Sequence, residues 1–135
     1  ISSKKKLEEF AKNFTLKVNK GEILYLYGEM GVGKTTFAKY FIQKLQLAFN
    51  KKITEVTSPT FNIMNEYILE NLIVKHYDLY RLKSENELKD LNLFENIEND
   101  ILLIEWPQII KNEPSSVIKL YFEYENDFKK RFIKI

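Results

Sequence analysis

The chain has 135 residues, of which 44% are hydrophobic and 30% charged, and this predicts one globular domain over residues 1–135. The net charge of +2 gives no general argument for nucleic-acid binding, and the absence of cysteine excludes disulfides, thiolate metal sites and thiol catalysis. No apolar run approaches the roughly 18 residues of a membrane span, so we expect a cytoplasmic protein without a membrane segment.

The first predicted elements are a helix and a hairpin. Residues 4–14 carry apolar side chains at helical spacing. Strand-like runs at 15–18 and 22–27, joined by a turn, are expected to pair and lead into the next motif. The lysines at 4–6 are interpreted as a solvated helix face, with a contact to RNA or to a partner protein as the alternative.

Residues 28–35 read Gly-Glu-Met-Gly-Val-Gly-Lys-Thr, which matches the phosphate-binding loop G-x-x-x-x-G-K-[ST] (the P-loop). The motif lies between a predicted strand at 23–27 and a predicted helix at 36–47, where such a loop binds phosphate. Lys34 is expected to reach the β- and γ-phosphates, and the Thr35 hydroxyl to hold Mg²⁺. No clear guanine-reading motif accompanies it, which favours an adenine nucleotide. The residues expected to bind nucleotide here are Glu29, Met30, Gly31, Val32, Gly33, Lys34, Thr35 and Thr36.

A stiff polar loop, Thr57-Ser58-Pro59-Thr60-Phe61, follows the P-loop helix. In P-loop nucleotidases the corresponding segment often senses the γ-phosphate. From the pattern alone, a switch and an ordinary turn are equally good interpretations.

Two runs at 61–69 and 72–79 are predicted to form an antiparallel pair of strands. Asp78 lies at the end of the second run, where a second acidic residue commonly anchors Mg²⁺. His76 is the only histidine of the chain, and we expect it to pack or hydrogen-bond in the core rather than to bind a ligand. Arg81 is interpreted as a structural ion-pair partner, with a cation near the phosphate as the alternative.

A second acid competes with Asp78 for the metal. The run 101–104 is fully apolar, as in a strand buried on both faces, and it ends at Glu105. A carboxylate at the end of a buried strand needs a partner, such as a cation or a polarised water. We therefore expect Asp78 and Glu105 both to face the cation and the γ-phosphate, beside a fixed turn at Trp106-Pro107. A capping or loop role for Glu105 is the alternative.

The remaining predicted elements complete the chain. Ser84 to Glu87 form a capping box that begins a short helix, and Asn92 is a candidate for the left-handed residue behind it. Alternating residues at 117–124 and a return run at 128–135 predict a terminal hairpin. The basic residues at 129–131 either protect the sheet edge or contact the nucleotide or a partner.

Taken together, these motifs resemble the TsaE family of small bacterial P-loop ATPases. Four blocks carry the resemblance: residues 27–36, 57–61 with 65–67, 76–82 with 87–88, and 103–107. The P-loop alone is unspecific, but the Ser-Pro-Thr-Phe, Asp-Leu-Tyr-Arg and Glu-Trp-Pro blocks together are characteristic of that family. In the first block, Glu29-Met30 replaces the commoner Asp-Leu.

The resemblance implies a P-loop fold that binds ATP and Mg²⁺ and hydrolyses ATP weakly. It implies a role, with the partners TsaB and TsaD, in threonylcarbamoylation of adenosine 37 in tRNAs that read ANN codons, with any contact to tRNA indirect. Carried over by position, Thr35 and Glu105 become Mg²⁺ ligands and Asp78 the partner acid. The 57–60 loop becomes a switch, Trp106 a residue near the site, and Arg131 a residue near the nucleotide.

We therefore predict an α/β domain with a P-loop, in which a mostly parallel sheet carries antiparallel additions. The predicted catalytic residues are Lys34, Asp78 and Glu105, with the attacking water aligned by Glu105 or Thr60. Two other functions are consistent with the P-loop: a small-molecule kinase and a nucleotide-gated binding module with little turnover.

Overall fold

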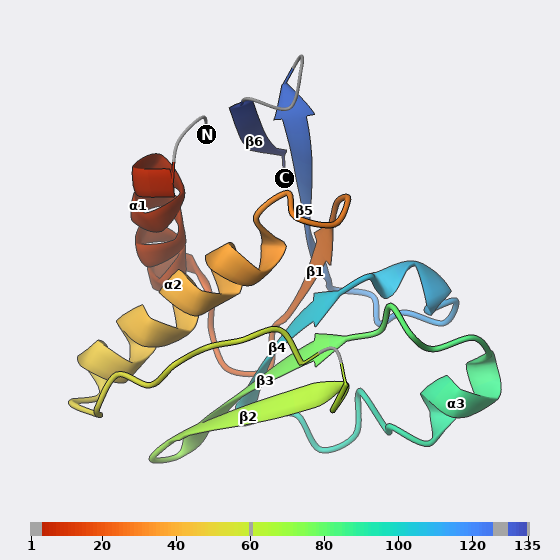
Figure 1. Ribbon diagram of the computed structural model, residues 1–135. Helices are drawn as coiled ribbons and strands as arrows, with labels where there is room; N and C mark the ends of the chain where they lie inside the picture. Colours follow the sequence, from red (N-terminus) through yellow and green to blue (C-terminus); the bar gives the residue numbers. More distant parts are fainter. Residues whose placement is uncertain (1–3, 60, 126–129, 135) are drawn as a thin grey trace.

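A six-stranded sheet organises the chain (Figure 1). The structure is a computed structural model that describes residues 4–59, 61–125 and 130–134. The strands are β1 (Ile23–Tyr27), β2 (Met64–Leu69), β3 (Leu72–Asp78), β4 (Asp100–Glu105), β5 (Ile118–Glu125) and β6 (Lys130–Lys134). The helices are α1 (Lys4–Phe14), α2 (Lys34–Ala48) and α3 (Glu85–Lys89), with 3-10 turns at Thr15–Lys17 and Pro107–Ile109.

The strand order is β2-β3-β4-β1-β5-β6. The four inner strands β3, β4, β1 and β5 are mutually parallel, and β2 and β6 each add one antiparallel strand at an edge. This confirms the predicted α/β fold with a mostly parallel sheet. It also confirms both predicted antiparallel pairs, although residues 126–129 of the terminal hairpin lie outside the described part.

The two faces of the sheet are covered differently. Helices α1 and α2 pack on one face (Figure 1), where Leu24 and Leu103 lie in a core shared with Phe37 of α2. On the other face, Tyr25 and Leu102 belong to a second core that α3 and the neighbouring loops complete. Every residue of β4 is buried, as its apolar run predicts for a central strand.

One predicted strand is wrong. Residues Thr15–Lys17 form a 3-10 turn that continues α1, because the Thr15 hydroxyl donates a hydrogen bond to the carbonyl of Lys12 (2.7 Å). Leu16, expected in a strand, is 82% exposed. The proposed hairpin is therefore absent from the described residues, and β1 pairs with its parallel neighbours β4 and β5 instead.

Two other element boundaries shift for local reasons. The strand expected from residue 61 begins only at Met64, because Ile63 has a positive φ of 69° and its N–H donates to the carbonyl of Pro59 (2.6 Å). Helix α2 begins at Lys34 rather than at residue 36, directly after the left-handed Gly33. The earlier start of α2 places Lys34 and Thr35 of the P-loop in the first turn of the helix.

The short helix α3 follows its sequence prediction. The Ser84 side chain accepts a hydrogen bond from the N–H of Glu87 (3.3 Å), as in a capping box, and Asn92 has a positive φ of 49°. Among the described residues, no helix has the length and apolarity needed to cross a bilayer.

Candidate functional site

The P-loop connects the carboxyl end of β1 to the amino end of α2. Its first position admits only glycine: Gly28 has a φ of 151°, and a Cβ there would lie 2.7 Å from the carbonyl oxygen of Phe122. Gly33 (φ 116°) is the residue before α2 and also lies in the left-handed region. The loop therefore delivers the amino end of α2, with its unpaired N–H groups and partial positive charge, to the mouth of the site.

A cavity of about 270 Å³ opens against this loop. Its lining includes most of the predicted nucleotide-binding residues and the predicted acids: Met30, Gly31, Gly33, Lys34, Thr35, Thr36, Ser58, Asp78, Glu105 and Trp106. Two residues of the predicted set do not line this cavity: Val32 is buried in the core and Glu29 is exposed.

The described residues do not test whether two further predicted residues, Thr60 and Arg131, lie at the cavity. Thr60 lies outside the described residues. Arg131 lies in β6, paired with Tyr124 of β5, and its side chain is not among the described ones.

The two acids come from adjacent strands. Asp78 ends β3 and Glu105 ends β4, and their Cα atoms are direct partners in the parallel register. Both side chains are buried. Asp78 accepts hydrogen bonds from the Ser58 hydroxyl on Oδ2 and from the N–H of Tyr80 on Oδ1, each at 3.0 Å. Ser58 therefore links the polar loop at 57–61 to Asp78.

Glu105 contacts the P-loop directly. The Thr35 hydroxyl lies 3.1 Å from Oε1 and 3.0 Å from Oε2 of Glu105. The Nε2 atom of His76 lies 2.6 Å from Oε2, and both of these side chains are almost completely buried. These contacts exclude the alternative that Glu105 is a simple loop or capping acid, because it is the last residue of a buried strand.

Lys34 is held inside the site. Its Nζ donates a hydrogen bond to the carbonyl of Gly28 (2.6 Å) and lies 3.5 Å from the ring centroid of Trp106, within cation–π range. Burial lowers the pKa of Lys34 to about 8, although the nearby carboxylates of Glu105 and Asp78 act in the opposite direction. The ammonium group is thus poorly solvated and close to two acids.

Trp106 takes an unusual backbone conformation. Its φ of 56° is left-handed, and Pro107 then begins a 3-10 turn. The fixed turn predicted beside Glu105 is present, but a residue before proline usually prefers an extended backbone. The left-handed residue lies directly after Glu105, and its ring lies over Lys34 and 4.8 Å from the ring of Tyr80. Trp106 therefore lines the cavity, and the sequence resemblance implied a position near the site.

Sequence reasoning placed His76 in the core but missed its contact with Glu105. The available signal was its position two residues before Asp78, which puts both side chains on the same face of a strand. The contact also depends on how β3 pairs with β4, and one sequence does not give that register.

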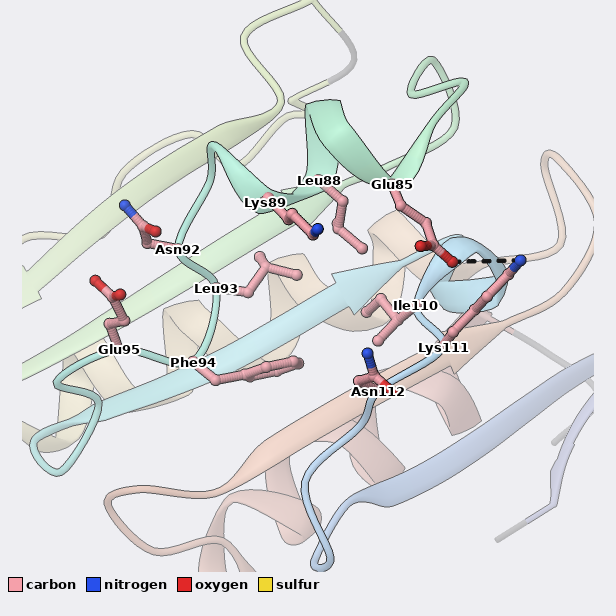
Figure 2. Close-up of a pocket in the computed structure, with 10 residues that line it drawn as sticks. All are labelled: Glu85, Leu88, Lys89, Asn92, Leu93, Phe94, Glu95, Ile110, Lys111 and Asn112. Atoms are coloured by element: carbon pink, nitrogen blue, oxygen red, sulfur yellow. Dashed lines mark ion pairs between the residues drawn. The ribbon is translucent and has the colours of Figure 1, made fainter.

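A second cavity, of about 300 Å³, lies beside α3 and contains none of the predicted site residues (Figure 2). An ion pair between Glu85 and Lys111 (3.3 Å) crosses its rim. Its apolar lining consists of Leu88, Leu93, Phe94 and Ile110. Lysines line both cavities, but only the P-loop cavity combines a lysine with two buried carboxylates.

Comparison with known proteins gives a consistent result. The family model "Threonylcarbamoyl adenosine biosynthesis protein TsaE" matches residues 1–133. The TsaE protein of Rickettsia bellii is 35% identical over 131 residues, covering 96% of this chain and 88% of the relative. That of Borreliella burgdorferi is 41% identical over 112 residues, covering 81% of this chain and 77% of the relative.

The fold comparison points the same way. A crystal structure of Bacillus subtilis YdiB superposes with a TM-score of 0.73 at 26% identity, covering 98% of this chain and 79% of YdiB. The relatives named above are tRNA threonylcarbamoyladenosine biosynthesis proteins. With the P-loop, the paired acids and the family match over nearly its whole length, this chain belongs to the TsaE family of tRNA threonylcarbamoyladenosine biosynthesis proteins.

Proposed function

We propose that this protein binds ATP with Mg²⁺ and hydrolyses it slowly, as an accessory step in threonylcarbamoylation of tRNA. The observation that carries the proposal is the convergence of Lys34, Thr35, Asp78 and Glu105 on one cavity at the P-loop. A cation, a hydroxyl and two carboxylates beside a helix amino end are the groups that phosphoryl transfer uses.

The P-loop is proposed to hold the phosphates. Backbone N–H groups at the start of α2 would donate to phosphate oxygens, and the helix dipole favours their negative charge. The Lys34 ammonium is now bonded to the Gly28 carbonyl and lies against Trp106. Phosphate oxygens are stronger acceptors than a neutral carbonyl, so Lys34 would exchange these contacts for the β- and γ-phosphates.

The residues at the back of the cavity fit Mg²⁺. Thr35, Asp78 and Glu105 offer only oxygen atoms, which this cation prefers, and two buried carboxylates benefit from a compensating charge. Mg²⁺ commonly uses one or two carboxylates and takes its other ligands from phosphate and water. No group of three or more His, Cys, Asp or Glu side chains able to hold a metal occurs among the described residues. Bound there, Mg²⁺ would supply charge neutralisation at the phosphate oxygens.

Glu105 is the best candidate to orient the attacking water. Its carboxylate lines the cavity at the end of a buried strand and contacts the Thr35 hydroxyl. Thr60 is proposed as a second group for this task, and Arg131 as a contact to the nucleotide from the last strand. Ser58 would relay changes at Asp78 to the polar loop 57–61, which we propose acts as a switch.

The proposed partners are TsaB and TsaD, with ATP turnover acting on their complex and any tRNA contact indirect. Membership of the TsaE family supports a place in the pathway that its name states. The two named partners are those that the sequence resemblance implies. An isolated ATPase of this kind is slow when a partner completes the site.

Product analysis tests the reaction type. The protein is incubated with ATP and Mg²⁺, and the products are identified and quantified by phosphorus NMR. We expect ADP and free phosphate in equal amounts. A phosphorylated acceptor molecule would instead identify a small-molecule kinase. Bound ATP that is recovered unchanged, alone and with TsaB and TsaD, would identify a nucleotide-gated binding module.

A further inference from the structure

The only histidine of the chain lies directly behind the site. His76 is in β3, its side chain is 0% exposed, and its Nε2 atom lies 2.6 Å from Oε2 of Glu105. Since His76 does not line the cavity, the proposed hydrolysis assigns it no direct task. A buried imidazole nevertheless needs hydrogen bonds, so its contact with Glu105 requires an explanation.

Hydrogen-bond chemistry assigns the proton on the ring. An ionised carboxylate only accepts hydrogen bonds, so the Nε2 atom of His76 must be the donor to Glu105. The Nδ1 atom finds no partner among the described residues. The contact geometry therefore places the shared proton on Nε2.

The two contacts of Glu105 have different consequences. The Thr35 hydroxyl is nearly equidistant from the two carboxylate oxygens, at 3.1 and 3.0 Å, and cannot distinguish them. His76 contacts Oε2 only. It therefore fixes the rotation of the carboxylate and leaves Oε1 with more free lone-pair directions.

We propose that His76 is a positioning residue, whose Nε2–H holds Oε2 of Glu105 so that Oε1 is presented to the cation and the reacting water. This inference rests on the proposed function of the site. Hydrogen bonds behind a metal ligand typically change metal affinity or activity about 10- to 100-fold. Loss of the donor should therefore weaken Mg²⁺-dependent steps and spare contacts made by the P-loop alone.

Two variants separate the donor from the bulk of the ring. His76→Leu fills the space without an N–H, and His76→Gln supplies an amide N–H at a similar reach. ATP affinity is measured by calorimetry in EDTA and again with Mg²⁺, and the ratio of the two dissociation constants gives the Mg²⁺ gain. In EDTA, we expect both variants to bind ATP with an affinity within about twofold of wild type. The Mg²⁺ gain should be on the order of tenfold smaller in His76→Leu and unchanged in His76→Gln.

Two results would overturn the proposal. One is an unchanged Mg²⁺ gain in His76→Leu. The other is an equal loss in His76→Leu and His76→Gln, which would mean that the fit of the ring matters and its N–H does not.

A spectroscopic measurement covers the case in which His76→Leu does not fold. Because the chain has one histidine, a nitrogen-15 NMR spectrum of the nucleotide-free protein, without a histidine tag, reports His76 alone. We expect a proton on Nε2, and a proton on Nδ1 only would overturn the inference. If wild-type protein shows no Mg²⁺ gain, the proposed function fails, while this spectrum still decides whether His76 donates to Glu105.

Discussion

The Thr35 hydroxyl contacts both carboxylate oxygens of Glu105, at 3.1 and 3.0 Å, although 70 positions separate the two residues in the sequence. Thr35 is the second residue of α2 and Glu105 the last residue of β4. The parallel pairing of β1 with β4 brings the P-loop and this acid to the same edge of the sheet. Two groups that are both proposed to serve Mg²⁺ are thus in direct contact.

Replacing Thr35 tests that pair. Thr35→Ser keeps the hydroxyl, and Thr35→Val keeps the shape without it. We expect the Mg²⁺ concentration for half-maximal turnover to rise on the order of tenfold in Thr35→Val and to stay near wild type in Thr35→Ser. The Mg²⁺ dependence of phosphate release checks this. Equal behaviour of the two variants would remove the hydroxyl from the site.

Removal of the buried cation should disable nucleotide binding. We expect Lys34→Ala to abolish hydrolysis, because Lys34 is the one positively charged side chain among the described residues that line the cavity. Hydrogen bonds to charged groups contribute about 1.5–3 kcal/mol, so ATP affinity should fall roughly 10- to 100-fold. Lys44→Ala is the matched control, since Lys44 lies on the same helix about 15 Å further along. Wild-type affinity in Lys34→Ala, measured by calorimetry, would show that the P-loop is not the ATP site.

Glu105 should matter for turnover more than for binding. We expect Glu105→Ala to lower the turnover rate on the order of a hundredfold while ATP still binds, as for loss of one positioning or charge-stabilising group. Glu105→Gln keeps the size of the side chain and should also be slow. The exposed Glu95→Gln serves as the control for a general loss of charge. Unchanged turnover in Glu105→Ala would leave this acid with a structural role only.

An ion pair remote from the cavity gives a stability prediction. The Nζ atom of Lys75 lies 3.0 Å from Oδ2 of Asp100, whose side chain is 6% exposed. Breaking a buried pair costs about 3–5 kcal/mol of unfolding free energy. We expect Lys75→Met to lower the unfolding free energy by an amount near or below the low end of that range. The reason is that the Lys75 side chain is 21% exposed, so the pair is only partly shielded from water.

The control for this pair is the double variant. Lys75→Met with Asp100→Asn removes the unpaired charge and should recover part of the loss in chemical denaturation. A double variant that is less stable than Lys75→Met would contradict the explanation.

The sequence predicted those parts of the site that local chemistry dictates. A P-loop needs glycine at fixed positions, as the contact of a hypothetical Cβ at Gly28 with Phe122 demonstrates. The apolar run of β4 predicted a central strand, and Glu105 at its end predicted a buried acid that needs a partner. These inferences need only spacing and polarity, so one sequence was sufficient.

Other features depend on tertiary pairing and were not predicted. The contact of His76 with Glu105 arises from the register of β3 against β4. The turn at Thr15–Lys17 looked like a strand because its apolar residue alternates with polar ones, but a hydrogen bond to Lys12 extends α1 instead. The left-handed Trp106 contradicts the usual preference before proline, and only the packed site accounts for its position over Lys34.

The most direct test of the proposed function is phosphate release from ATP and Mg²⁺, measured with the protein alone and then with TsaB and TsaD together. We predict a low basal rate that the pair raises severalfold, with Glu105→Ala slow in both conditions. ATP that binds but yields no phosphate in either condition would contradict a partner-stimulated ATPase, and Asp78 and Glu105 would then be anchors for the cation rather than catalysts.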